Sequence, residues 1–97
     1  MITHLVLFKF KPGITLQDMR VQSWIEQMND LPKHIPGITG WQHGPNVTKD
    51  DEAYDYALAS RFENEGTLQI YFEHPVHRAC MLQGDELMTL CFVDLRH

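Results

Sequence analysis

The sequence lacks long apolar runs and clusters of basic residues. No stretch approaches the ~20 consecutive apolar residues that a membrane-spanning helix needs, so we expect no membrane contact. The 97 residues carry a formal net charge of −5, and their Lys and Arg residues are scattered along the chain. Nucleic-acid binding needs a basic surface, so we expect no nucleic-acid partner.

Cysteine is also scarce. The chain has two, Cys80 and Cys91, and their spacing fits neither a disulfide framework nor a zinc motif. Residues 1–4 contain no basic region and no small-residue cleavage site, so we expect no signal peptide. These features predict a cytoplasmic protein with reduced thiols. The length and the 43% hydrophobic residues are ordinary for one globular domain, and we assign residues 1–97 to a single domain.

The hydrophobic pattern predicts four strands and three helical segments. Branched and aromatic residues mark the strands, and an i, i+3, i+4, i+7 repeat such as Val21, Trp24, Ile25 and Met28 marks a helix. Strands are expected at residues 2–10, 38–44, 54–63 and 87–95, and helices at 15–31, 65–72 and 75–83. With its second helix in two pieces, this order predicts an α+β, ferredoxin-like βαββαβ protomer.

Several residues predict where the helices begin and end. Thr15 followed by Asp18 resembles a capping box at the start of the first helix, and Pro32 is expected to stop that helix. His74 is expected to cap the last helix, with Pro75 at its first position, where a missing N–H costs nothing.

Both faces of the predicted sheet are apolar. Phe8 and Leu58 belong to faces with large side chains, whereas Ala57 and Ala59 point the opposite way. The helices can cover only one face. The small alanines favour close helix packing, so we expect the face with Phe8 and Leu58 to be buried against a second copy. The sequence therefore predicts a homodimer joined through its sheet faces.

One tyrosine and two histidines fall within the seven residues Tyr71 to His77. His77 is expected in the first turn of a helix, where unpaired N–H groups disfavour an imidazolium, so we expect a neutral ring. A neutral histidine close to a phenol can transfer protons near pH 7. The alternative is that Tyr71 packs in a core and the histidines cap a helix, a role that suits His74. His4, on the first strand, is either a third pocket residue or a core histidine.

The histidines also raise the alternative of a metal site. His74 and His77 have suitable spacing, and His4 could add a third nitrogen in space. Closed zinc sites usually need four ligands, and neither cysteine has a partner at motif spacing. We therefore expect no metal and no cofactor.

The sequence resembles the stress-responsive dimeric α/β-barrel (Dabb) family over essentially its whole length. The matching segments, in family order, are His4–Lys11, Ile35–Gly37, Gly44–Asn46, Tyr54–Leu58, Phe62–Glu63, Tyr71–His77 and Phe92–Asp94. The Tyr-x-x-His-Pro-x-His element is the most specific of them. The resemblance implies a ferredoxin-like protomer that dimerises sheet to sheet into a dimeric α+β barrel, with a cavity between sheet and helices.

The resemblance also implies roles for individual residues. A related plant polyketide cyclase, olivetolic acid cyclase, closes a ring by aldol chemistry without a cofactor. Its catalytic tyrosine and histidine match Tyr71 and His77, and a histidine on its first strand matches His4. A pocket tyrosine on its first helix has no match, since this chain has Trp24-Ile25-Glu26 there.

Three functional hypotheses follow. In the first, the protein is a cofactor-independent enzyme acting on a carbonyl or polyketide-like molecule, with His77 as base, Tyr71 binding the developing enolate and His4 orienting the substrate. In the second, the cavity binds a small apolar ligand without catalysis. In the third, the dimer is a structural stress-response protein. An open pocket favours the first two, and a pocket filled by Trp24 and Met28 favours the third.

Overall fold

A computed structural model describes residues 1–97 as one four-stranded sheet with three helices. In chain order the elements are β1 (Ile2–Phe10), α1 (Met19–His34), β2 (Ile38–Pro45), β3 (Tyr56–Phe62), α2 (Glu65–Glu73), α3 (Pro75–Asp85) and β4 (Met88–Arg96). All strand pairs are antiparallel, in the order β2-β3-β1-β4. The protomer has the α+β, ferredoxin-like fold that the sequence predicts.

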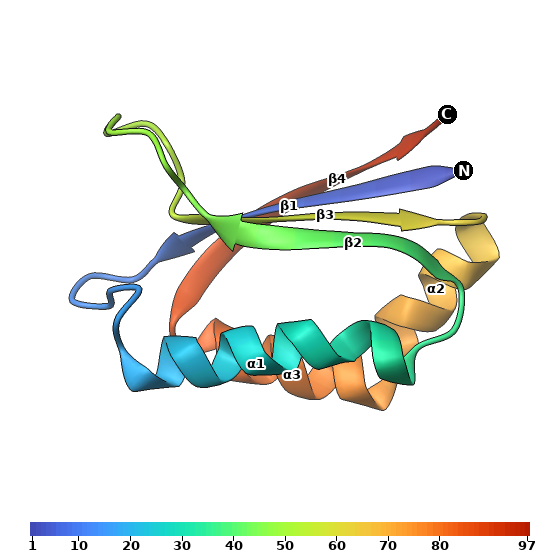
Figure 1. The fold of residues 1–97 in the computed structure, drawn as a ribbon, viewed down its shortest axis with the longest axis horizontal. Coiled ribbons are helices and arrows are strands. Elements are labelled where there is room, and N and C mark those ends of the chain that lie inside the picture. Colours follow the sequence, from blue (N-terminus) through green and yellow to red (C-terminus); the bar gives the residue numbers. More distant parts are fainter.

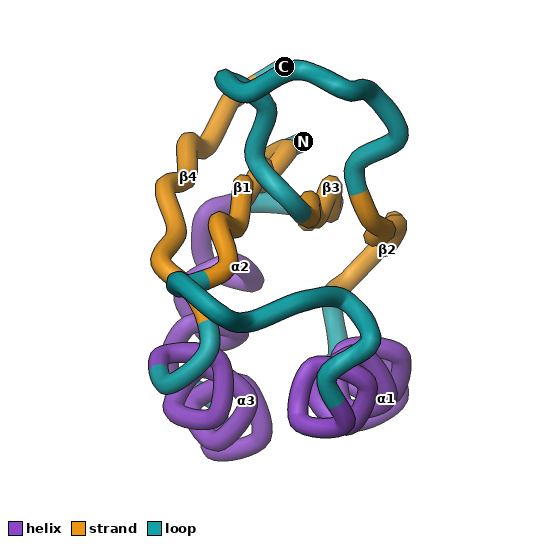
Figure 2. Tube along the Cα trace, turned by 90° about the vertical axis from the view of Figure 1, so that its left-hand side faces the viewer, coloured by secondary structure: helices purple, strands orange, loops and turns teal.

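The three helices all lie on one side of the sheet, and no helix covers the other side (Figures 1 and 2). The helix α1 buries a stripe at helical spacing, formed by Val21, Trp24, Met28 and Leu31. In β1 and β3 every second residue is buried, as expected for strands with one covered face. None of the three helices combines the length and the apolar character that crossing a membrane requires.

The sheet face that the helices cover is the one with the large side chains. Phe8 and Leu58 are 6% and 2% exposed and belong to the core, whereas Ala57 and Ala59 are exposed on the opposite face. The prediction that Phe8 and Leu58 lie in a dimer interface was therefore wrong. Strand alternation shows which residues share a face, but not which face meets the helices. Large side chains face the helices because alanines there would leave the space between the layers unfilled.

The helix α1 begins later and ends later than the sequence predicts. Its N-cap is Asp18, whose carboxylate accepts a hydrogen bond from the Arg20 backbone N–H at 2.9 Å, so the predicted capping box at Thr15 was wrong. Pro32 lies inside the helix and does not end it. Proline has no N–H to donate to the Met28 carbonyl four residues earlier. The Trp41 indole N–H donates to that carbonyl at 2.9 Å and replaces the missing bond.

The break between α2 and α3 is capped as predicted. His74 Nδ1 accepts a hydrogen bond from the Val76 backbone N–H at 3.1 Å, and Pro75 occupies the first helical position. The preceding helix begins with a capping box between Asn64 and Thr67, which the sequence analysis missed. These caps fix the direction in which α2 and α3 present their side chains to the sheet.

Candidate functional site

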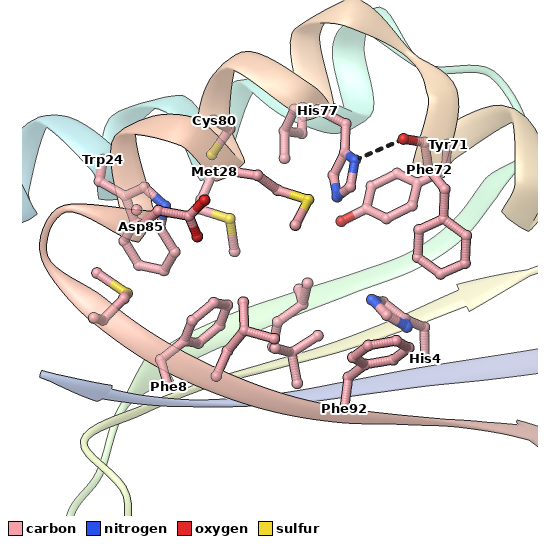
Figure 3. Close-up of a pocket in the computed structure, with 17 residues that line it drawn as sticks. His4, Phe8, Trp24, Met28, Tyr71, Phe72, His77, Cys80, Asp85 and Phe92 are labelled. Atoms are coloured by element: carbon pink, nitrogen blue, oxygen red, sulfur yellow. Dashed lines mark hydrogen bonds between the residues drawn. The ribbon is translucent and has the colours of Figure 1, made fainter.

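A cavity of about 160 Å³ lies between the sheet and the helices. Thirteen of its 17 lining residues are hydrophobic, and they come from β1, α1, β3, α2, α3 and β4. An apolar cavity of roughly 150 Å³ is enough to hold one benzene molecule. Trp24 and Met28 line the cavity without filling it, as Figure 3 shows. The space is therefore suited to a small, largely apolar molecule.

Tyr71 projects from α2 into this cavity and is 2% exposed. Its ring centroid lies 4.1 Å from that of His77, with 43° between the ring planes. The Tyr71 hydroxyl forms no hydrogen bond with another protein group, and it is not enclosed by protein atoms, so it stays accessible from the cavity. Burial raises the pKa of this hydroxyl far above its usual value of 10. The hydroxyl therefore stays protonated and can act as a hydrogen-bond donor.

His77 enters the same cavity from the first turn of α3 and is 6% exposed. Its Nδ1 lies 3.3 Å from the Phe72 carbonyl oxygen (Figure 3). A carbonyl only accepts, so Nδ1 carries the proton and Nε2 has a free lone pair. Burial, the largest cause, lowers the pKa of His77 to about 4. The ring is neutral at pH 7, as predicted, but desolvation is the main reason.

The break between the two helices supplies the carbonyl that orients His77. In a continuous helix the Phe72 carbonyl would accept from the Val76 N–H. That N–H donates instead to His74 Nδ1, so the carbonyl is one of the unpaired groups at the end of α2. The Tyr-x-x-His-Pro-x-His spacing thus places a capped helix start and an oriented imidazole next to Tyr71.

His4 reaches the cavity from β1 and is 3% exposed. Its ring centroid lies 5.8 Å from that of Tyr71. Its Nδ1 lies 2.6 Å from Asp94 Oδ1. The two residues are direct partners across β1 and β4, so their side chains share one face of the sheet. Asp94 was not among the predicted site residues, because its pairing with His4 depends on a strand register that the sequence does not specify.

The structure brings all three predicted site residues to one cavity, although they come from three different elements. Both Tyr71 and His77 line it, and no hydrogen bond joins the Tyr71 hydroxyl to the His77 ring. Their rings are tilted against each other, and both polar groups are available to a third molecule. Their catalytic roles, and that of His4, remain a prediction.

Comparison with known proteins assigns this chain to a family. The model of the stress responsive A/B barrel domain (Dabb) matches residues 2–95. The chain belongs to the Dabb family. An uncharacterised Streptomyces coelicolor protein is 33% identical to it over 94 residues, covering 97% of each chain.

Solved structures show the same fold. A dimeric protein of unknown function from Bacteroides fragilis has a TM-score of 0.85 and 27% identity, covering 99% of this Dabb chain and 95% of its own. A hydroxynitrile lyase from Passiflora edulis has a TM-score of 0.77 and 14% identity, covering 99% and 94%. At that identity the likeness to the lyase concerns the fold alone.

The titratable residues of this Dabb protein do not cluster in the manner of a metal site. No group of three or more His, Cys, Asp or Glu side chains is arranged to hold an ion. His74 is committed to its cap, since its Nδ1 accepts from Val76. What the cavity offers chemically is a neutral imidazole, a protonated phenol and a second imidazole on the opposite wall.

Proposed function

We propose that this protein is a cofactor-independent enzyme that transfers a proton on a small carbonyl or polyketide-like molecule. One observation carries the proposal: the Tyr71 hydroxyl and the His77 Nε2 lone pair both face one apolar cavity without a protein partner. A general base positioned in this way contributes roughly 10²–10⁴-fold, and a donor to a developing oxyanion roughly 10²–10³-fold.

The proposed step balances in protons and charge. His77 Nε2 removes a proton from the carbon next to a carbonyl, forming an imidazolium and an enolate. The Tyr71 hydroxyl donates a hydrogen bond to the enolate oxygen, and His4, held by Asp94, orients the substrate. The enolate carbon then attacks a second carbonyl in an aldol step, which forms a C–C bond and an alkoxide that takes the proton from the His77 imidazolium. Alternatively, the enolate carbon takes that proton back.

The low basicity of His77 restricts the substrate. A histidine whose pKa is about 4 is a weak base, so the proton that it removes must itself be acidic. A C–H group between two carbonyls, or between a carbonyl and an aromatic ring, is more acidic than one beside a single carbonyl. Poly-β-ketone chains contain such groups, which is why a polyketide-like substrate is the class we favour.

A second candidate function is non-catalytic binding of a small apolar ligand. The predominance of hydrophobic lining residues favours it, since such a wall stabilises a ligand without any chemistry. The third hypothesis, a purely structural stress-response protein, is disfavoured because Trp24 and Met28 leave the cavity open.

We also propose that the protein is a homodimer joined through the uncovered sheet face. That face carries a shallow apolar hollow whose lining includes Leu7, Ala57 and Val93. Leu7 and Val93 are 45% and 50% exposed in the protomer. The Bacteroides fragilis relative is described as dimeric. Two copies packed in this way would form a dimeric α+β barrel.

A cytoplasmic location is also part of the proposal. Both cysteines are free, as reduced thiols in that compartment would be.

Proton exchange tests the catalytic proposal without knowledge of the natural substrate. Phenylacetone carries a methylene between a ring and a carbonyl, and NMR in heavy water follows the loss of its protons. We expect the protein to accelerate the exchange by about 10²-fold or more, and His77→Ala to abolish the acceleration. Tyr71→Phe should reduce it by about tenfold or more.

The surface histidine His34 provides the matched control, since it is exposed on α1. His34→Ala should exchange phenylacetone at the wild-type rate. Equal exchange by wild type and His77→Ala would contradict the proposal. Saturable binding of phenylacetone with no exchange would favour the ligand-binding function instead.

A further inference from the structure

The end of the cavity opposite Tyr71 and His77 carries a carboxylate. Asp85, the last residue of α3, is among the lining residues, and Figure 3 shows its side chain at the far end from His4 and Tyr71. Asp85 is an exposed residue at the cavity rim, and its carboxylate is in none of the salt bridges of the structure; the Lys11 ammonium donates to the Asp85 backbone oxygen, at 2.5 Å. The acidic side chain is therefore free to accept from a bound molecule.

An unpaired donor lies at the same end. Trp24 is 2% exposed and lines the cavity, and its indole N–H, which makes no hydrogen bond within the protein, is not enclosed by protein atoms and stays accessible. The backbone of α3 approaches it closely, since a Cβ on Gly84 would lie 3.1 Å from Trp24 Nε1. Gly84 directly precedes Asp85, so the indole donor and the carboxylate acceptor border the same part of the cavity.

The two polar ends are separated by an apolar middle. Asp85 lies eight residues after His77 on the same helix, which corresponds to about 12 Å along its axis. Between them the helix contributes Cys80, whose thiol has its pKa raised to about 11 by burial and remains neutral. A ligand that contacts both ends needs two polar groups joined by an apolar body the size of one ring.

We infer that Asp85 is a specificity-determining residue, which selects ligands with a neutral hydroxyl or amine donor at the end distal to the reacting carbonyl. An ionised carboxylate only accepts hydrogen bonds, so it favours a donor and repels a second anion. The Trp24 N–H can donate to the same hydroxyl oxygen. The inference rests on the proposed function for the orientation of the ligand, with its carbonyl at Tyr71.

Three matched ligands test the inference by binding alone. Phenylacetone, para-hydroxyphenylacetone and para-carboxyphenylacetone share the ring and the carbonyl and differ at the distal end. Their dissociation constants are measured by NMR titration for wild type, Asp85→Asn, Asp85→Ala and Glu86→Gln. Glu86 is the control, because it is the adjacent acid, is exposed as Asp85 is, and does not line the cavity.

We expect wild type to bind the hydroxyl ligand about tenfold more tightly than the carboxyl ligand, since one hydrogen bond to a charged group has at least that effect. Asp85→Asn should remove most of the penalty on the carboxyl ligand, and Asp85→Ala should also remove the preference for the hydroxyl ligand over phenylacetone. Glu86→Gln should leave all ratios unchanged.

Unchanged ratios in both Asp85 variants, an equal effect of Glu86→Gln, or no binding of any of the three ligands would overturn the inference. The exchange assay separates this result from the catalytic proposal. Discrimination at Asp85 without proton exchange would contradict only the catalytic role of His77. Exchange without discrimination would contradict only the role of Asp85.

Discussion

His4 Nδ1 and Asp94 Oδ1 lie 2.6 Å apart across the pairing of β1 with β4. Because the carboxylate is an acceptor, the shared proton belongs to His4 Nδ1 when the ring is neutral, and Nε2 keeps its lone pair. The side chain of His4 is 4% exposed and that of Asp94 is 29% exposed, so the pair links the cavity wall to the protein surface. Asp94 is therefore placed to fix the orientation and tautomer of His4.

Asp94→Asn should lower phenylacetone exchange by about tenfold, because an amide orients the ring less strongly than a carboxylate. It should also reduce the free energy of unfolding by about 1–3 kcal/mol. Nitrogen NMR of the His4 ring provides a readout that a general loss of stability would not change, since we expect a mixture of tautomers. Asp51→Asn, in the exposed loop, is the control. If Asp94→Asn keeps both the wild-type tautomer of His4 and the wild-type exchange rate, Asp94 has no role in the site.

His77→Ala and His74→Ala should separate catalysis from capping. His74→Ala removes the N-cap of α3 and should cost about 0.5–2 kcal/mol of stability with exchange retained. His77→Ala should lose the exchange while its circular dichroism spectrum stays that of wild type. Denaturant unfolding measures the stability of both variants, and the exchange assay measures their activity. Loss of exchange in His74→Ala at a temperature where it is fully folded would show that His74 has more than a capping role.

The order of the helices and strands could be predicted from the sequence, because each has its own periodicity and is bounded by turn residues. The residues at which the helices begin and end were less predictable. Pro32 normally ends a helix, but here Trp41, nine residues later, satisfies the carbonyl that the proline leaves unpaired. Such a bond forms only when β2 returns against α1, so the local sequence gives no sign of it. The assignment of Phe8 and Leu58 to the wrong side of the sheet has the same cause.

Some residues of the candidate site could likewise be predicted from the nearby sequence, whereas others depend on contacts between distant segments. Tyr71 and His77 are close in the chain, and the His74-Pro75 cap that orients them is a local feature. Asp94 and Asp85 are not recognisable from their neighbours. The first depends on strand register, and the second depends on where α3 ends against α1.

The pH dependence of stability and activity should reflect the low pKa of His77. Its pKa falls from 6.5 to about 4 on folding, so between these values the unfolded chain binds the extra proton. The contribution of His77 to the free energy of unfolding should therefore rise with pH across this window and be constant above it. The exchange rate should fall as pH decreases through about 4, where the base becomes protonated.

Thermal unfolding and exchange measured across this pH range test the assignment. The difference in stability between wild type and His77→Ala isolates the contribution of this one histidine, since the other titratable groups are common to both proteins. A rate that falls through pH 6.5 instead would mean that the working base keeps an ordinary histidine pKa, and that His77 is not that base.

Leu7→Asp and Leu58→Asp should have different consequences, because the two leucines point to opposite faces of the sheet. Leu7 is 45% exposed in the protomer, and Leu58 is 2% exposed beneath the helices. If the uncovered face joins two copies, light scattering should give wild type twice the 11.3 kDa chain mass. Leu7→Asp should give a folded monomer, since a charge would enter an apolar interface. Leu58→Asp should unfold the protein, because the charge would be buried in the core. A dimeric Leu7→Asp variant, or a monomeric wild type at micromolar concentration, would show that this sheet face is not the interface.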